Sequence, residues 1–265
     1  MKSSPDIDTT SEVASRTAGS PSIVLSDVIV DRGRSTVLQV PHLEIAAGYT
    51  ALVGPNGSGK STMLHVIAGL LHPSQGSVRL LPSGTRDANV AYVLQSQRAS
   101  EHLLVTAREV VRLARRRTFP GAASRAERVV VNAVMERLGI LDLANRHLAD
   151  MSGGQRQRVF IAQGLAQQAD ILLLDEPVAG LDLASEQTIR SAIDDERAAG
   201  RTVVVATHDL AEATRADRVV MLNGTVVASG PPAEVLRPEN LRQAYRGRVL
   251  DLGDGSIAID DDHHH

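Results

Sequence analysis

The stretch GPNGSGKS, Gly54 to Ser61, decides the fold of this chain. It matches the pattern G-x-x-x-x-G-K-S/T, and it lies between an apolar run, YTALV at 49–53, and a run with helical spacing, STMLHVIAGLL at 61–71. Glycines let successive backbone N–H groups turn toward an anion, and the helix N-terminus adds a favourable dipole. The alternative is a glycine-rich turn that binds nothing, but the strand, loop and helix around it favour a phosphate-binding loop.

We therefore predict that this loop holds the triphosphate of a nucleotide. Lys60 is expected to reach the terminal phosphates, and the Ser61 hydroxyl is expected to bind Mg²⁺. The residues predicted to contact the nucleotide here are Gly54, Pro55, Asn56, Gly57, Ser58, Gly59, Lys60, Ser61 and Thr62.

Two carboxylates end a second apolar run, ILLLDEP. Asp175 follows four apolar residues, so it is expected at the carboxyl end of a buried strand, where α/β sheets bind ligands. We predict that Asp175 holds Mg²⁺ through water and that the adjacent Glu176 orients or deprotonates the attacking water. A pair of helix-capping residues without chemistry is the alternative, and the phosphate loop argues against it.

A second anion-binding element is predicted at MSGGQRQR, residues 151–158. Two glycines and a serine precede an apolar-periodic run, so they lie at the start of a helix, with bare N–H groups, a hydroxyl and the positive end of the dipole. This element lies about ninety residues after the phosphate loop, and that loop is already expected to bind the phosphates of one nucleotide. We predict that two identical chains lie head to tail and that each SGGQ closes over the γ-phosphate held by the other.

The amino-acid composition limits the classes of protein to which the chain can belong. The chain has 265 residues, a net charge of −3, no cysteine, no tryptophan and only five other aromatic residues, so a nucleic-acid footprint is not expected. No apolar run approaches the ~18 residues of a membrane span, and the N-terminus lacks the apolar core of a signal peptide. We expect a cytoplasmic protein.

The order of elements predicts an α/β fold: a mostly parallel sheet flanked by helices, with an antiparallel β subdomain and an inserted α-helical subdomain. Pro41 favours an edge strand, and Asn223-Gly224 and Asp254-Gly255 predict hairpins. In the helix expected at 124–140, Val130, Val134 and Leu138 form the apolar face, and Gly139 ends the helix. The predicted divisions are a leader at 1–21 and one domain at 22–265, made of a nucleotide-binding core with the β subdomain (22–95 and 169–230), the helical subdomain (96–168) and a helix and hairpin tail (231–265).

These motifs together resemble a known family. GPNGSGKST, MSGGQRQR, ILLLDEP, AGLD at 179–182 and ATHD at 206–209 follow in the order and at the spacings of the ATP-binding subunit of ABC transporters, over roughly residues 22–230. The resemblance implies a P-loop ATPase that binds ATP and Mg²⁺. It also implies a signature motif acting on the partner copy, formed by Ser152, Gly153, Gly154 and Gln155.

The resemblance assigns three further residues. Gln95 would touch Mg²⁺ or water and report to a membrane subunit, Asp182 would lie at the dimer contact, and His208 would contact the γ-phosphate. Taken singly, a histidine such as His208 is more often a strand-end residue with a backbone partner, and Gln95 carries no signal.

Two positions depart from the family pattern. Met151 stands where the signature usually has leucine, which is a mild apolar change. Arg32 stands where the family often has an aromatic residue that stacks on adenine. A guanidinium can stack on a base, and the alternative is a solvated arginine.

The resemblance also implies partners: a second copy of the chain, transmembrane permease subunits that dock on the helical block, and a substrate-binding protein. This places the chain on the inner face of the cell membrane. The arginines at 112 and 115–117 are either a solvated face or a contact with a partner or lipid.

The cargo is predicted from the tail alone. GPPAEVLRPENLRQAY at 230–245 looks like the tail of importers of manganese, zinc or iron, and His263–His265 are either a weak metal site or a purification tag. The alternatives are import of another substrate, a nucleic-acid or ribosome-associated ATPase, and a binder that does not hydrolyse ATP.

Overall fold

We describe the protein from a computed structural model, which covers residues 20–82, 87–94, 104–115, 124–245, 249–251 and 257–259. Several predictions fall outside these residues: the role of Gln95, the arginines at 116 and 117, the Asp254-Gly255 turn, the terminal histidines and nearly all of the leader.

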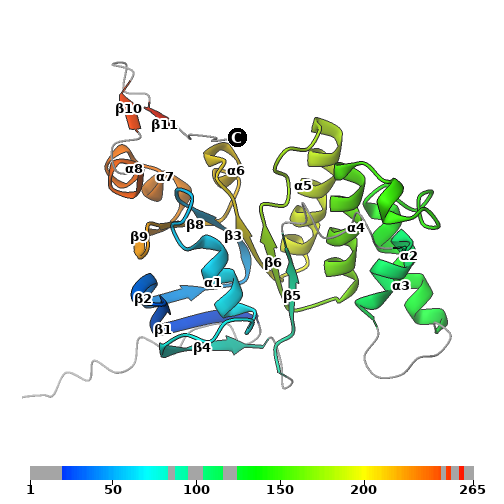
Figure 1. The fold of residues 1–265 in the computed structure, drawn as a ribbon, viewed down its shortest axis with the longest axis horizontal. Helices are drawn as coiled ribbons and strands as arrows, with labels where there is room; N and C mark the ends of the chain where they lie inside the picture. Colours follow the sequence, from blue (N-terminus) through cyan, green and yellow to red (C-terminus); the bar gives the residue numbers. More distant parts are fainter. Residues whose placement is uncertain are drawn as a thin grey trace, which may run out of the picture.

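A six-stranded sheet forms the centre of the molecule (Figure 1). The strand order is β5 (Val90–Val93), β6 (Ile171–Asp175), β7 (Thr202–Ala206), β3 (Gly48–Val53), β8 (Arg218–Leu222) and β9 (Val226–Gly230). The first five are parallel and β9 is antiparallel to β8. β6 and β7 are buried along their whole length, as expected of apolar runs in the middle of a parallel sheet. The carboxyl ends of β6, β7 and β3 are therefore neighbours, which places the ILLLD end, the ATHD segment and the phosphate loop along one edge.

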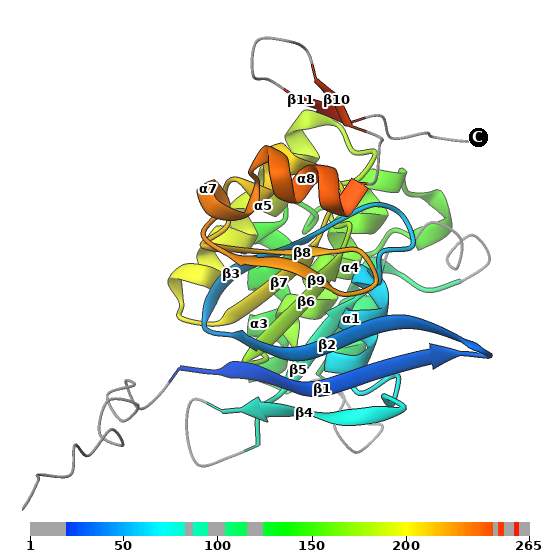
Figure 2. The ribbon, with the colours of Figure 1, turned by 90° about the vertical axis from the view of Figure 1, so that its left-hand side faces the viewer.

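A smaller antiparallel sheet lies beside it, with the order β2 (Ser35–Ile45), β1 (Ser22–Arg32) and β4 (Gln75–Leu81) (Figure 2). Pro41 lies in the edge strand β2, as predicted. Helix α1 (Lys60–Ile67) packs between the two sheets, since its Met63 and Leu64 share one apolar core with Ile23 of β1 and Leu173 of β6. α1 is shorter than the predicted 61–71, because the chain leaves the helix before Gly69, which has φ +70°.

The helices on the other face of the large sheet form a separate layer (Figure 1). This layer contains α2 (Ala107–Leu113), α3 (Arg125–Arg137), a short 3₁₀ turn η1 (Leu148–Asp150), α4 (Gly153–Ala166) and α5 (Leu183–Ala198). The predicted apolar face of α3 was right at Leu138 and wrong at Val130 and Val134. Val131, Met135 and Leu138 are fully buried, whereas Val130 and Val134 are partly exposed, because α2 and α4 pack on the adjacent stripe. Gly139 follows the helix at φ +59°, as predicted.

The rest of the chain returns to the large sheet. α6 (Leu210–Ala213) lies between β7 and β8, and α7 (Pro232–Val235) and α8 (Pro238–Tyr245) follow β9. The β8–β9 hairpin turns at Asn223-Gly224, and β10 (Val249–Asp251) pairs antiparallel with β11 (Ile257–Ile259), so both hairpin pairings are confirmed. None of the helices in the described ranges has the length and apolar character needed to cross a membrane.

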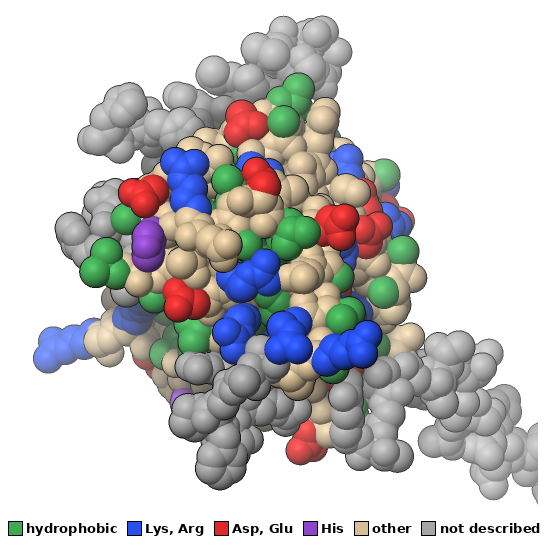
Figure 3. Space-filling view, turned by 90° about the vertical axis from the view of Figure 1, so that its right-hand side faces the viewer, with side chains coloured by type: hydrophobic (Ala, Val, Ile, Leu, Met, Phe, Trp, Pro, Cys, Tyr) green, Lys and Arg blue, Asp and Glu red, His purple; other side chains and the backbone are tan. Residues whose placement is uncertain are grey.

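Basic side chains gather on the outer face of the helical layer (Figure 3). Two of the arginines singled out in the sequence have partners within the chain. Arg112 pairs with Glu127 at 3.2 Å, and Arg115 donates to Gln168 Oε1 at 2.8 Å. These contacts join α2 and the residues just after it to other segments of the same chain.

Candidate active site

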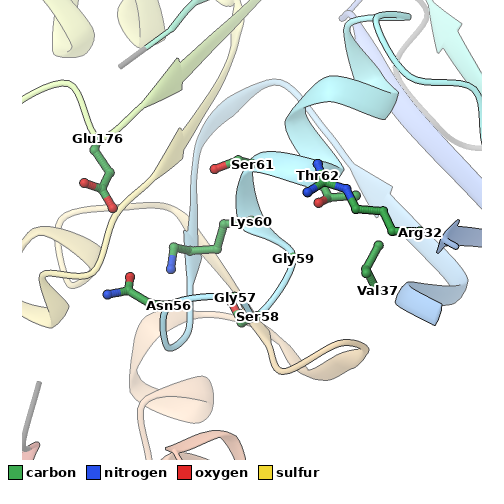
Figure 4. A pocket seen from close by; sticks show the side chains of 10 residues that line it. All are labelled: Arg32, Val37, Asn56, Gly57, Ser58, Gly59, Lys60, Ser61, Thr62 and Glu176. Atoms are coloured by element: carbon green, nitrogen blue, oxygen red, sulfur yellow. The ribbon is translucent and has the colours of Figure 1, made fainter. Parts of the chain in front are cut away.

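A cavity of about 370 Å³ lies over the phosphate loop (Figure 4). Glu176 forms one wall, and two residues of the antiparallel sheet form another. The lining residues are Arg32, Val37, Asn56, Gly57, Ser58, Gly59, Lys60, Ser61, Thr62 and Glu176. All of these except Val37 were among the residues predicted for the site, and the base contact of Arg32 stays a prediction.

The backbone of the loop requires glycine at particular positions. Gly54 has φ +148°, and a Cβ there would lie 2.1 Å from the Leu222 carbonyl oxygen, so no side chain fits. Gly57 has φ +78° with no heavy atom of the described residues within 4 Å of a Cβ position, which leaves its backbone open to the cavity. Gly224 N–H donates to the Ser58 carbonyl at 2.9 Å, so the β8–β9 hairpin supports the loop from outside.

Polar groups on the floor of the cavity suit a phosphate. The Lys60 ammonium is buried and donates to the carbonyl oxygens of Gly54 at 2.6 Å and Pro55 at 3.2 Å. The Ser58 hydroxyl is buried and has no hydrogen-bond partner among the described residues. An ammonium group at the base of a loop whose backbone N–H groups face the cavity is a donor set that suits a phosphate. The loop therefore fits the polyphosphate that the sequence predicts.

Asp175 lies at the end of β6 between two hydroxyl groups. Ser61 hydrogen-bonds to it, and Tyr92 of β5 donates to its Oδ2 at 3.4 Å. Burial raises the pKa of the Asp175 carboxyl, the hydrogen bond from Ser61 opposes this shift, and the negative charge of Glu176 adds to it. A buried carboxylate beside a serine hydroxyl is the oxygen donor set that Mg²⁺ prefers, and a cation there would favour the ionised carboxylate.

Glu176 and His208, which the sequence analysis assigned separate roles at the γ-phosphate, lie side by side. Nδ1 of His208 lies 3.5 Å from Oε1 of Glu176, and the Glu176 N–H donates to the Ala206 carbonyl at 2.9 Å. Glu176 has φ +47°, a left-handed conformation that costs a residue with a side chain of the order of 1–3 kcal/mol and that recurs at functional sites. Because β6 and β7 are neighbours, the side chains of Glu176 and His208 both lie at the carboxyl edge of the large sheet.

The signature segment lies elsewhere. Ser152 caps α4, with its N–H donating to Gln155 Oε1 at 3.1 Å and its Oγ accepting from Gln155 N–H at 3.3 Å. Neither residue lines the cavity, nor do Gly153 and Gly154. α1 and α4 pack on opposite faces of the large sheet, so the sheet separates the two anion-binding elements within one chain (Figure 1).

Asp182 lies next to the signature segment. It caps α5, where its Oδ1 accepts from Ser185 N–H at 2.9 Å and its Oδ2 from the Ser185 hydroxyl at 2.8 Å. The hydrogen bond from the Ser185 backbone lowers the pKa of the Asp182 carboxyl, and the bond from the Ser185 hydroxyl adds to this. A Cβ on Gly154 would lie 3.1 Å from Ser185 Oγ and 3.4 Å from Asp182 Oδ2. The AGLD and SGGQ segments therefore form one surface.

Two residues of the site were missed by sequence reasoning. Val37 lines the cavity beside Arg32, and Tyr92 contacts Asp175. Tyr92 could have been noticed as a phenol within the otherwise small and aliphatic strand NVAYVL, but no pattern marks Val37.

A phosphate loop between a parallel strand and a helix, with carboxylates at the end of a nearby strand, defines a P-loop nucleotide hydrolase. Residues 38–179 match the ABC transporter family, and the chain belongs to this family. The predicted fold class and the resemblance to the ATP-binding subunit are confirmed, and the chain is an ATPase subunit of this class.

Relatives extend the match beyond this segment. YfeB of Yersinia pestis, a protein of a chelated iron transport system, is 34% identical over 251 residues, which are 91% of this chain and 85% of YfeB. MntA of Synechocystis, an ATP-binding protein of a manganese transport system, is 37% identical over 205 residues, 75% of this chain and 79% of MntA. The dimeric structure of MJ0796, a bacterial ABC transporter cassette, is 30% identical with a TM-score of 0.70, covering 79% of this chain and 98% of that one.

Proposed function

We propose that two copies of this chain bind MgATP between them, head to tail, and hydrolyse it to drive a permease that imports a divalent metal ion. The chain would sit on the inner face of the cell membrane beneath transmembrane permease subunits, with a substrate-binding protein delivering the metal on the outer side.

One observation carries the proposal. The signature segment begins α4 with two glycines, a serine and no acidic residue, as an anion-binding helix start would, yet it does not line the cavity of its own chain. A head-to-tail copy would bring Ser152, Gly153 and Gln155 over the phosphates held by the other chain and would place Asp182 in the contact. The related cassette MJ0796 has a dimeric structure, which supports a dimer of this chain.

Each site residue then has a role in an in-line phosphoryl transfer to water. Ser61, Asp175 and Gln95 would hold Mg²⁺, which when bound neutralises charge on the phosphates. Glu176 would orient and deprotonate the water, and His208 would contact the γ-phosphate. Arg32 and Val37 would contact the base, the arginine through its guanidinium plane and the valine through its methyl groups.

The cargo is proposed from two sequence similarities. The 230–245 segment resembles the tail of divalent-metal importers, and YfeB and MntA are named for iron and manganese transport. Uptake of Mn²⁺, Zn²⁺ and Fe²⁺ by cells that lack the chain, complemented with the wild-type chain or with Lys60→Ala, tests this. We expect one of the three metals to be taken up only with the wild-type chain, and equal uptake in both strains would contradict the cargo.

The catalytic proposal is tested with Glu176→Gln. The amide keeps the shape of the pocket but cannot accept a proton, so we expect ATP to bind, turnover to fall below detection and a dimer to accumulate in sedimentation experiments. Glu239→Gln, an exposed carboxylate on α8, is the control and should behave like the wild type. Turnover by Glu176→Gln at the wild-type rate would remove Glu176 from the mechanism.

A further inference from the structure

A buried carboxylate follows the ATHD segment. Glu212 is 2% exposed and belongs to α6, which begins two residues after His208. This helix has only four residues, and Asp209 caps it by accepting from Ala211 N–H at 2.8 Å. A single turn is not stable by its own hydrogen bonds, so contacts with the rest of the fold must hold it.

Those contacts converge on Glu212. Its Oε1 accepts from the Tyr49 hydroxyl at 3.2 Å, its Oε2 accepts from Arg190 Nε at 2.5 Å, and Arg215 Nε lies 3.9 Å from Oε1. Arg190 also pairs with Glu186 one turn earlier on α5. Burial raises the pKa of the Tyr49 hydroxyl and the charge of Glu212 adds to the shift, so Tyr49 stays a donor.

The partners lie on the elements that carry the other motifs. Tyr49 is in β3, the strand that runs into the phosphate loop. Arg190 is on α5, about two turns, or roughly 12 Å, from the Asp182 cap at its start. The Glu212 carboxylate thus links three elements: β3, which leads into the phosphate loop, α5, which begins at the Asp182 cap, and α6, which follows His208.

We infer that Glu212 is a positioning residue, which fixes α6 through its bonds to Arg190 and Tyr49. Because α6 follows His208 closely, His208 then moves with α5 and faces the γ-phosphate when the dimer closes. This rests on the proposed function, because it needs two copies to press on the Asp182 segment. Arg190 would transmit a shift at the N-terminal cap of α5 to Glu212 in α6. The shift would then reach His208, because His208 lies only four residues before Glu212.

The chain offers a matched control in Glu196. This carboxylate is 4% exposed and also pairs with two arginines, Arg137 at 2.7 Å and Arg201. It joins α5 to α3 and to the turn before β7, and none of these contacts reaches α6. Glu196→Gln therefore disturbs a comparable buried ion pair without touching the helix after His208.

The test compares Glu212→Gln, Tyr49→Phe and Glu196→Gln in the full chain by MgATP hydrolysis and by hydrogen exchange of residues 207–214. Loss of a hydrogen bond to a charged group predicts a kcat about tenfold lower for Glu212→Gln, with KM unchanged within about twofold and faster exchange in this segment. Tyr49→Phe should give the same pattern with a fall of about threefold. Glu196→Gln should keep both the wild-type kcat and the wild-type exchange rate.

Three results would overturn the inference. One is a wild-type kcat in Glu212→Gln, another is a KM that rises as much as kcat falls, and the third is the same loss of kcat in Glu196→Gln. If Glu212→Gln does not fold, Tyr49→Phe decides by the same criteria. If the wild type itself does not hydrolyse ATP, the proposed function fails, whereas the exchange rates still report whether Glu212 holds α6.

Discussion

The two adjacent glycines at the start of α4 have different reasons to lack a side chain. A Cβ on Gly154 would lie 3.1 Å from Ser185 Oγ, closer than an ordinary contact, and 3.4 Å from Asp182 Oδ2 of the same chain. A Cβ on Gly153 would meet no heavy atom of the described residues within 4 Å. Nothing described within one chain therefore requires glycine at 153, which agrees with an outside ligand such as a phosphate of the partner copy.

Alanine at each position separates these reasons. Gly153→Ala should leave the thermal midpoint unchanged or raise it, since alanine is up to about 1 kcal/mol better than glycine within a helix. Its ATP turnover should nevertheless fall, because the methyl group occupies the space of a phosphate. Gly154→Ala should lower the midpoint. Thermal denaturation and ATPase assays check both, and full activity in Gly153→Ala would remove the need for an outside ligand there.

At the scale of elements, α2 and α4 begin with the same capping box but differ in charge. Thr106 and Glu109 cap α2, and hydrogen bonds from the Thr106 backbone and hydroxyl lower the pKa of Glu109. Ser152 and Gln155 cap α4 with a neutral amide in place of the carboxylate. The positive end of the α2 dipole thus has an anion of its own, whereas the first turn of α4 holds no acidic residue.

Gln155→Glu tests what that neutral amide is for. A carboxylate at this position should keep the capping box and stabilise α4 by about 0.3–1 kcal/mol. It should also repel a bound phosphate, so ATP turnover should fall while the thermal midpoint rises. Glu109→Gln is the reciprocal control, and it should lower stability slightly and keep the turnover of the isolated chain. A Gln155→Glu protein with wild-type turnover would show that no anion approaches this helix.

The elements themselves were largely predictable because their signals are local. The runs YTALV and ILLLD became the buried strands β3 and β6, and Gly139 ended α3 as its lack of a Cβ allows. The buried stripe of α3 was not predictable in the same way. Valines at 129–131 and 134 fit several helical faces, and only the packing of α2 and α4 chooses among them.

The site was predictable where a motif fixes both residue type and backbone, as in Gly54 to Ser61. Contacts between distant segments carry no such signal. Tyr92 reaches Asp175 because β5 and β6 are neighbours, and Tyr49 reaches Glu212 across 163 positions of chain. The left-handed backbone of Glu176 is likewise invisible in the sequence, since most glutamates at strand ends have a negative φ.

At the scale of the whole molecule, the sheet separates the two halves of the site. The phosphate loop and α1 pack on one face with the antiparallel sheet, and the signature helix α4 packs on the other with α2 and α3. Each motif begins a helix that packs on its own face of this sheet, and the signature segment does not line the phosphate cavity of its own chain. A second copy related by a two-fold axis supplies the missing surface twice, once for each nucleotide.

Mixing two inactive variants tests this symmetry. Lys60→Ala disables the phosphate loop, and Gly153→Asp places a negative charge in the signature segment, so each variant alone should hydrolyse no ATP. In a mixed dimer, one site combines both defects, whereas the other combines an intact phosphate loop with an intact signature segment. An equal mixture should therefore recover about a quarter of the wild-type turnover, since half of the dimers are mixed and each has one complete site. The double variant mixed with the wild type is the control, because its mixed dimers place one defect in each site and should add no activity. No recovery in the first mixture, with mixed dimers shown to form by subunit exchange, would mean that each chain completes its own site.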